Sequence, residues 1–261
     1  GMRLETGQYF YAMELIEGET LNDRVRHAGP LDARTTIKIA QQVTSALAAA
    51  EKQGLVHRDL KPANLMLVPR DSETSNNKKL RVKIIDFGLA KAIHTATDSK
   101  SLTHGRFVGT PTFASPEQFE HSALDVRSDI YSLGETLWFA LTGKTPFSQH
   151  SVEEIRRAQQ SNALPIEQLK AAHVPSRLRS LIESMLALEP ASRPGTRELA
   201  ARLQGCSPEA RSARRMRVTL AAAGIALLVV VALATALLPF LRNAPARSLA
   251  TAVDKSIAVL P

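Results

Sequence analysis

The sequence predicts an α+β fold, with a mainly helical C-terminal part that is followed by one transmembrane helix. Three observations predict this class. Apolar residues recur at helical spacing in several stretches, two short apolar runs flank a polar stretch as in a β-hairpin, and residues 218–241 carry no charge. The hydrophobic content of 44% is ample for a core.

The N-terminal half begins with strand and helix signals. Residues 8–15 form an aromatic-rich run that is typical of a strand. Residues 31–53 have apolar side chains every three or four positions, which predicts a helix. Gly54 is expected to end that helix as a C-cap, so that residues 55–56 form a short strand.

A hairpin is expected next. Residues 65–68 form a short apolar strand and residues 80–85 alternate as a half-exposed strand. The polar, turn-rich residues 69–79 between them are expected to be a solvated loop, to which we assign no chemistry.

The C-terminal half reads as a set of helices. An apolar run over residues 129–141, ended by Gly143, predicts a buried helix. Further helices are expected over residues 152–160, 176–188 and 196–203.

Residues 218–241 are long enough to cross a bilayer, which needs about 20 apolar residues. The alternative is a buried helix of a soluble domain, but such helices rarely exceed about 14 residues without a polar face. Four arginines precede the run within residues 206–217, and the positive-inside rule places that side in the cytoplasm. Residues 206–217 are therefore expected to be a basic juxtamembrane linker, and residues 242–261 the start of a truncated extracytoplasmic region.

Composition limits the partners. The net charge of +8 would suit nucleic acid, but aromatic residues are only 5% and no basic stripe with interleaved aromatics is present, so no nucleic acid is expected. A single cysteine, Cys206, cannot form an intrachain disulfide, which suits a reducing cytosol.

Three motifs then follow one another in a fixed order. The first is His57-Arg58-Asp59-Leu60-Lys61-Pro62-Ala63-Asn64, the second Asp86-Phe87-Gly88 and the third Ser115-Pro116-Glu117. An isolated Asp-Phe-Gly is weak evidence, but the joint match is very specific. The chain resembles a eukaryotic-like serine/threonine protein kinase of the bacterial receptor type, from about Tyr9 to about Gly205.

The resemblance implies a domain division and a nucleotide site. Residues 1–16 would be the last small-lobe strand and the hinge, and residues 17–205 the C-terminal lobe of a protein-kinase-like fold. Met13 would be the gatekeeper beside the adenine of ATP. The backbones of Glu14 and Ile16 would face that adenine, and Met66 would also contact the nucleotide.

The resemblance also assigns the chemistry. Asp59 would be the catalytic base, and Lys61 would lie beside the γ-phosphate as a catalytic and ATP-binding residue. Asn64 and Asp86 would hold Mg²⁺, a hard ion that prefers oxygen ligands. These four residues are the core of the predicted active site.

The activation segment is expected to contain Thr110, whose hydroxyl would link the substrate-binding loop to the base. Ser101 and Thr103 are the favoured phosphate carriers, and Thr95, Thr97 and Ser99 compete with them. Any of these is equally well explained as a polar loop residue. Arg58 would grip a phosphorylated segment, because guanidinium binds phosphate in a bidentate way.

Two structural contacts are implied as well. Glu117 would pair with Arg193 and tie the activation segment to the lobe. Asp129 would hold from beneath the backbone of the first motif, residues 57–64, which is the catalytic loop of the family.

The expected function is ATP-dependent phosphorylation of serine or threonine hydroxyls on proteins by a membrane-anchored signalling kinase. It would reside in the plasma membrane as a single-pass protein, with its kinase part in the cytoplasm. The sequence has no Gly-rich loop, no strand lysine and no helix glutamate to pair with it, so we expect a fragment that largely lacks the small lobe, and its activity alone stays open.

Two alternatives are a membrane-tethered pseudokinase and a lobe-only docking module. The first predicts decayed catalytic residues, whereas Asp59, Lys61, Asn64 and Asp86 are intact. A homodimer across the membrane is a further hypothesis, since small residues at 221–226 offer a packing surface, but an ordinary span explains them equally well.

Overall fold

The computed structural model describes residues 14–69, 80–87, 111–120, 123–148, 151–161 and 163–207, and the backbone of two short strands before them. Backbone contacts divide the chain into two units, 1–211 and 212–261, and every described residue lies in the first. No helix in the described ranges is long and apolar enough to cross a membrane. The span predicted at residues 218–241 lies outside those ranges and stays a prediction.

The strands form two antiparallel sheets. In the first, β1 (Met2–Arg3) pairs with β2 (Tyr9–Phe10). The second has the order β3 (Glu19–Thr20), β4 (Leu65–Pro69), β5 (Leu80–Ile84). The predicted hairpin is confirmed as β4 and β5, whereas within the strand expected over residues 8–15 the described strand covers only β2, and residues 14 and 15 lie outside any strand.

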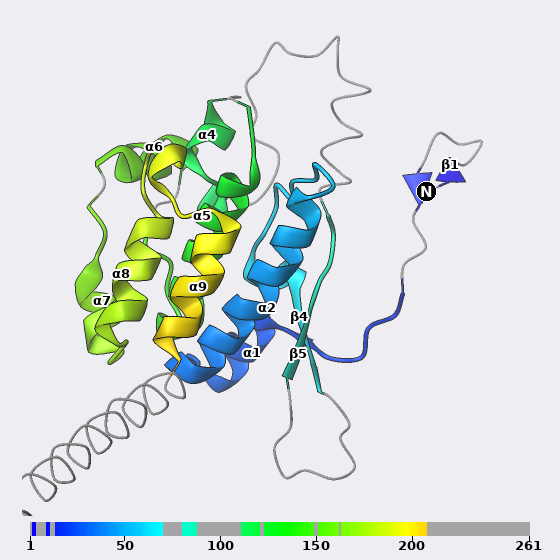
Figure 1. The fold of residues 1–261 in the computed structure, drawn as a ribbon, viewed down its shortest axis with the longest axis horizontal. Helices are drawn as coiled ribbons and strands as arrows, with labels where there is room; N and C mark the ends of the chain where they lie inside the picture. The colour runs from blue at the N-terminus through cyan, green and yellow to red at the C-terminus, as the bar shows by residue number, and fades with distance from the viewer. Residues whose placement is uncertain are drawn as a thin grey trace, which may run out of the picture. The chain divides into compact units, whose positions relative to one another are not determined.

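Helices make up most of the described lobe (Figure 1). They are α1 (Leu21–Ala28), α2 (Ala33–Glu51), α4 (Pro116–Phe119), α5 (Val126–Thr142), α6 (Val152–Ser161), α7 (Ile166–Ala171), α8 (Ser176–Met185) and α9 (Thr196–Cys206). Five predicted helices are confirmed. Those expected over residues 31–53, 129–141, 152–160, 176–188 and 196–203 are α2, α5, α6, α8 and α9. The helix expected to reach residue 188 ends at Met185.

The two ends of α2 have clear sequence causes. At its start the side chain of Asp32 accepts a hydrogen bond from the backbone N–H of Thr35, which satisfies one donor of the first turn. At its end Gly54 adopts a left-handed φ of 66°, and the N–H of Leu55 bonds back to the carbonyl of Ala50 over 3.0 Å. The short strand expected at residues 55–56 is therefore wrong, because the Leu55 N–H closes the helix instead of joining a sheet.

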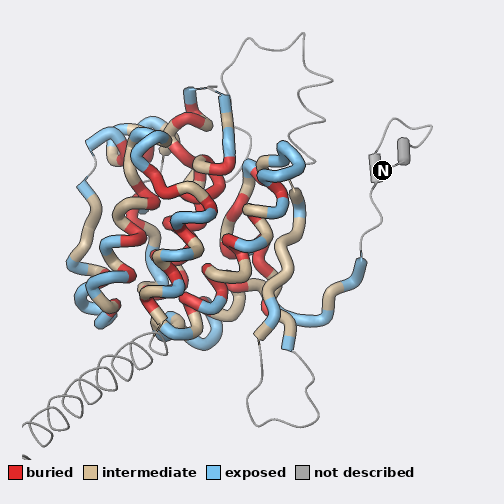
Figure 2. The backbone as a smooth tube through the Cα atoms, viewed as in Figure 1, coloured by how far each residue is buried: buried red, intermediate tan, exposed pale blue. Residues whose placement is uncertain are grey.

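The core is centred on α5, which is buried along nearly all of its length (Figure 2). It packs against α2 and α8, while α2 also packs against α9 and β5. Gly134 permits the close approach to α8, since a Cβ there would lie 3.1 Å from the Cβ of Met185. Fully buried side chains such as Trp138 and Leu137 each contribute about 1.5–3 kcal/mol of apolar burial.

One side chain of α2 secures the exposed edge of the second sheet. Gln42 donates from Nε2 to the carbonyl of Leu80 over 3.1 Å and accepts from the N–H of Val82 over 3.0 Å. These bonds satisfy backbone groups of the edge strand β5, which would otherwise be open to pairing. The hairpin is thereby fixed on α2, and its second strand leads directly to Asp86.

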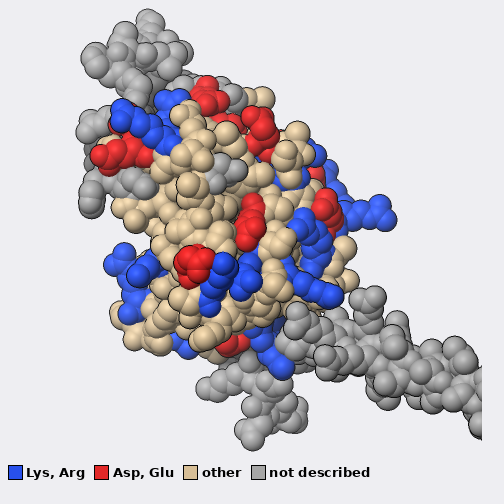
Figure 3. Space-filling view, turned by 90° about the vertical axis from the view of Figure 1, so that its left-hand side faces the viewer, with Lys and Arg blue, Asp and Glu red and all other residues tan. Residues whose placement is uncertain are grey.

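The surface carries both signs of charge. On the face shown in Figure 3, Lys and Arg side chains lie interspersed with Asp and Glu over the described part of the chain. Exposed pairs such as Lys170 with Glu167 stabilise the fold by less than about 1 kcal/mol each. The fold therefore depends mainly on the buried helices.

Candidate active site

The catalytic loop connects the end of α2 to β4, and α5 holds it from beneath. The N–H groups of His57 and Arg58 donate to Oδ2 and Oδ1 of Asp129 over 2.7 and 2.8 Å. Burial raises the pKa of Asp129 to about 6, although these two bonds oppose the rise. The side chain is therefore mostly ionised above pH 7, and both of its oxygens accept from the loop, in the arrangement that the resemblance implied.

Two polar side chains contact the carboxylate of Asp59. Its Oδ2 accepts from the Lys61 ammonium over 2.9 Å and from Nδ2 of Asn64 over 3.2 Å. No hydrogen bond from a described residue engages Oδ1, and the Asp59 side chain is 27% exposed. The carboxylate is thus fixed through Oδ2, and Oδ1 has no donor among the described residues.

The amide of Asn64 is oriented by the same loop. Its Nδ2 also donates to the backbone carbonyl of Asp59 over 2.8 Å. Since both of these bonds use the nitrogen, the amide oxygen Oδ1 is the atom that can ligate a cation. The backbone carbonyl of Asn64 accepts from the N–H of Ile85 over 3.0 Å, which joins the loop to the residue before Asp86.

His57 contacts the residues before and after Asp86 and so connects Asp86 to the catalytic loop. Its Nε2 lies 3.0 Å from the carbonyl of Ile85, and its ring centroid lies 4.6 Å from that of Phe87. Its Nδ1 accepts from the N–H of Asp59 over 3.3 Å, so the proton sits on Nε2. Burial lowers the pKa of His57, which keeps the ring neutral in this role, while the Ile85 carbonyl and the carboxylates of Asp59 and Asp86 oppose the shift.

Two residues of this region have a left-handed backbone that side chains disfavour. Arg58 has φ 67° and Asp86 has φ 56°, and such a conformation costs a non-glycine residue about 1–2 kcal/mol. Strain of this kind persists where surrounding bonds hold it, and it is common at functional sites. Here one strained residue, Arg58, directly precedes the predicted base Asp59. The other, Asp86, is a predicted metal ligand.

The oxygens of Asn64 and Asp86 suit Mg²⁺. In the described ranges no group of three or more His, Cys, Asp or Glu side chains could hold a metal ion without further ligands. Magnesium is usually bound by one or two protein carboxylates together with water and substrate phosphates. An exposed carboxylate at Asp86 and an oriented amide at Asn64 fit that pattern.

The expected nucleotide-binding residues lie around the second sheet. Met66 is half-buried in β4 and pairs in register with Lys83 of β5. The ammonium of Lys83 is 2.6 Å from Oε1 of Glu14, so Glu14 and Met66 share this neighbour. Ile16 is half-buried in the segment that leads to β3.

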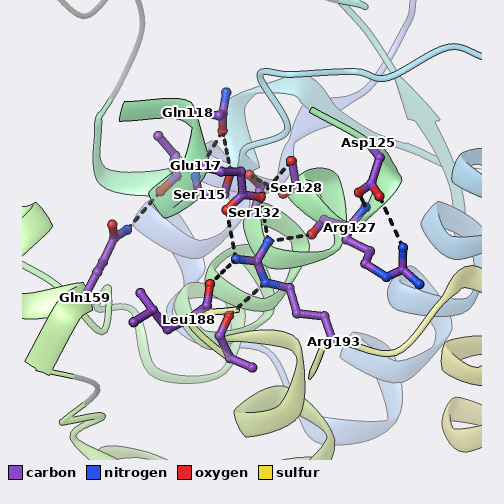
Figure 4. Close-up of polar contacts among 12 residues, drawn as sticks. Ser115, Glu117, Gln118, Asp125, Arg127, Ser128, Ser132, Gln159, Leu188 and Arg193 are labelled. Atoms are coloured by element: carbon purple, nitrogen blue, oxygen red, sulfur yellow. Dashed lines mark hydrogen bonds and ion pairs between the residues drawn. The ribbon is translucent and has the colours of Figure 1, made fainter. Parts of the chain in front are cut away.

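A buried ion pair holds the segment around Glu117 to the rest of the lobe (Figure 4). Arg193 donates from Nη1 and Nη2 to Oε1 and Oε2 of Glu117 over 2.6 and 2.9 Å. Burial alone would raise the pKa of Glu117, but the bonds and charge of Arg193, and a bond from Ser128, lower it. The predicted pair is present, and the guanidinium also donates to the carbonyls of Ala187, Leu188 and Arg127.

Four predicted residues cannot be placed. Met13, Ser101, Thr103 and Thr110 lie outside the described residues, so their expected roles stay predictions. Conversely, sequence reasoning gave no role to His57 or Gln118, which both bond to the catalytic loop. The position of His57 beside the base was a usable signal, whereas nothing in the sequence alone pointed to Gln118.

A helical lobe that presents a carboxylate, an ammonium, an amide and a second carboxylate around one loop is the arrangement of a phosphotransferase of the protein kinase class. Comparison with known proteins agrees. A family model described as the protein kinase domain matches residues 2–203, so the chain belongs to the protein kinase family.

Several similar bacterial proteins are serine/threonine-protein kinases by name. Serine/threonine-protein kinase pkn3 of Myxococcus xanthus is 36% identical over 79% of this chain and 38% of its own length. Serine/threonine-protein kinase PknL of Mycobacterium tuberculosis is 35% identical over 70% of this chain and 43% of its own. The chain thus spans about two fifths of the length of these bacterial relatives.

Solved structures show the same fold. The crystal structure of Rad53 1-466 in complex with AMP-PNP superposes with a TM-score of 0.57 and 26% identity, over 72% of this chain and 44% of that one. The ribbon of the lobe in Figure 1 is therefore a kinase-like arrangement.

Proposed function

We propose that the protein transfers the γ-phosphoryl group of ATP to serine or threonine hydroxyls of protein substrates, as a membrane-anchored signalling kinase. The observation that carries this proposal is the fixation of Asp59. Lys61 and Asn64 hold the carboxylate oxygen Oδ2, and no described residue donates a hydrogen bond to Oδ1. A carboxylate presented in this way can orient a hydroxyl and accept its proton.

The proposed step is a displacement at phosphorus. The substrate hydroxyl oxygen forms a bond to the γ-phosphorus while the bond from that phosphorus to the β–γ bridging oxygen breaks. The hydroxyl proton passes to Oδ1 of Asp59, and the products are a phosphoester and ADP. Lys61, whose Nζ lies 2.9 Å from Oδ2, stabilises the negative charge that the phosphoryl oxygens carry during transfer.

Asn64 and Asp86 would hold Mg²⁺. When bound, the ion neutralises charge on the β- and γ-phosphates. The two protein ligands come from separate elements, and the contacts of His57 and Ile85 keep them together. Serine/threonine specificity is supported by the names of the relatives and by Lys61, which is of the serine/threonine-kinase type.

The test is phosphoryl transfer by the product of the complete gene, with labelled Mg·ATP and casein as acceptor, followed by analysis of phosphoserine, phosphothreonine and phosphotyrosine. Asp59→Asn should lower the transfer rate by about 100-fold or more, since a positioned general base contributes at least that much. Asp32→Asn is the matched control. It keeps an N-cap acceptor at the far end of α2 and should transfer at the parent rate.

Labelled phosphotyrosine alone would contradict the proposed specificity. A parent that binds ATP without transferring phosphate would favour a pseudokinase instead, and an Asp59→Asn variant as active as the parent would remove Asp59 as the base.

Membrane anchoring is part of the proposal and is supported by the uncharged residues 218–241 and the arginines before them. The kinase part would then lie on the cytoplasmic side of the plasma membrane. The parent protein should stay with membranes washed in alkaline carbonate, whereas deletion of residues 218–241 should release it to the supernatant. Retention of the deletion variant in the pellet would contradict this assignment.

A further inference from the structure

The peptide plane between Arg58 and Asp59 is held at both of its polar atoms. The N–H of Asp59 donates to Nδ1 of His57 over 3.3 Å. The carbonyl of Arg58 accepts from Nε2 of Gln118 over 2.7 Å. Because a peptide unit is planar, fixing these two atoms fixes the orientation of the plane and the Cα of Asp59 with it.

This plane follows a strained residue. Arg58 has a left-handed φ of 67°, which costs about 1–2 kcal/mol, and its own N–H is held by Asp129 over 2.8 Å. Asp129 from α5 therefore holds one side of Arg58, and Gln118 from α4 holds the other. Without the second contact the carbonyl can rotate toward a relaxed backbone, and Asp59 would turn with it.

The other end of the Gln118 amide is engaged as well. Its Oε1 accepts from the backbone N–H of Ser115 over 3.0 Å and from the Ser115 hydroxyl over 3.3 Å (Figure 4). This is the glutamine half of a capping box at the start of α4. Ser115 is fully buried and directly precedes Pro116 and Glu117, which the Arg193 pair anchors.

We propose that Gln118 is a positioning residue for the base Asp59, which transmits the placement of the Ser115–Glu117 segment to the catalytic loop. The inference rests on the proposed function. It assigns separate tasks to the two ends of one amide: the oxygen caps α4, and the nitrogen sets the Arg58 carbonyl and hence Asp59.

A Gln118→Glu substitution separates these tasks. Glutamate is a standard acceptor at this position of a capping box, so the cap on Ser115 is kept. An ionised glutamate has no hydrogen to donate, so the bond to the Arg58 carbonyl is lost. A purely structural role in capping predicts no change in catalysis, whereas the positioning role predicts slower transfer.

The expected loss is about two- to tenfold in kcat at pH 8, since one such bond is worth about 0.5–1.5 kcal/mol. The KM for ATP should stay at the parent value, because Gln118 bonds to the loop and the Ser115 cap and to none of the predicted nucleotide-binding residues that the structure describes. The rate is expressed per nucleotide-binding site, counted by titration with a fluorescent ATP analogue, so that any unfolded fraction is excluded.

The pH profile gives a second readout. A protonated carboxyl can donate to the Arg58 carbonyl while its other oxygen accepts from Ser115, which reproduces the glutamine. The ratio of variant to parent kcat should therefore rise as the pH falls from about 8 to about 4.5, near the ordinary pKa of a glutamate carboxyl. Gln118→Met, which can neither donate nor accept, should show the loss in kcat without this recovery.

Gln168→Glu is the matched control. Gln168 lies on α7, and its Oε1 accepts a hydrogen bond from Nε1 of Trp138 over 3.0 Å. Glutamate keeps that acceptor. This variant should have the parent kcat at every pH.

A Gln118→Glu variant with parent kcat across the range would overturn the inference while leaving the proposed function intact. So would a loss confined to KM, or one that does not recover at low pH. A parent that transfers no phosphate would overturn the proposed function itself.

Discussion

At the scale of single residues, Glu135 is the most unusual side chain of the core. It is fully buried in α5, and neither of its carboxyl oxygens has a hydrogen-bond partner among the described residues. Burial raises its pKa well above the ordinary value, and the nearby Gln159 and Arg193 offset this only in part. Burial therefore favours the neutral, protonated form of this side chain in the folded protein.

A raised pKa has a definite consequence for stability. Above pH 4.5 the unfolded chain releases the Glu135 proton while the folded chain keeps it, so the free energy of unfolding falls as the pH rises toward the folded pKa. The slope from this group is at most about 1.4 kcal/mol per pH unit.

Glu135→Gln should remove this slope, because the amide is neutral at every pH. Urea unfolding at pH 5 and pH 8 should show a larger gain in the free energy of unfolding at pH 8. Glu153→Gln, an exposed change in the first turn of α6, is the control and should differ from the parent by no more than about 0.5 kcal/mol. An equal effect of Glu135→Gln at both pH values would mean that the group is already charged in the fold.

The motif and its resemblance to kinases predicted part of this chemistry. The acid, cation and amide of the catalytic loop pointed to Asp59, Lys61 and Asn64, and the structure brings these three into direct contact. The bond of Gln118 to Arg58 could not be predicted, because it joins residues 60 positions apart through a side chain with no local pattern.

At the scale of elements, α5 supports the site through hydrogen bonds from its first turn. Its first turn carries Asp129, which holds the catalytic loop, and Ser128, which bonds to Glu117 over 2.7 Å. Its apolar run made it predictable, and the Asp125 cap sets its start at Val126, earlier than the apolar pattern indicated.

Short elements were harder to predict. The six residues of α7 and the four of α4 give too few turns for periodicity to be visible. A proline precedes α7 and another is the first residue of α4, and a proline signals a boundary of either kind. The hairpin of β4 and β5 was predictable from two apolar runs, but its attachment through Gln42 was not.

At the scale of the whole molecule, the site depends on contacts between distant segments. Asp129 reaches back 72 positions to His57, and Arg193 reaches back 76 to Glu117. Local patterns cannot reveal such pairs, so their prediction came from the resemblance to kinases. The described lobe shows them, and the membrane segment and the activation-loop phosphate carriers stay predictions.

The central claim is that Asn64 of the catalytic loop and Asp86 after β5 hold one metal–nucleotide complex in front of Asp59. The most direct measurement is the enhancement of water proton relaxation when the complete gene product binds Mn·ATP, with Mn²⁺ in place of Mg²⁺. Asp86→Asn and Asn64→Leu should each weaken this binding by about tenfold or more, whereas Asp32→Asn should leave it unchanged. Parent-like binding of Mn·ATP by both site variants would contradict the account.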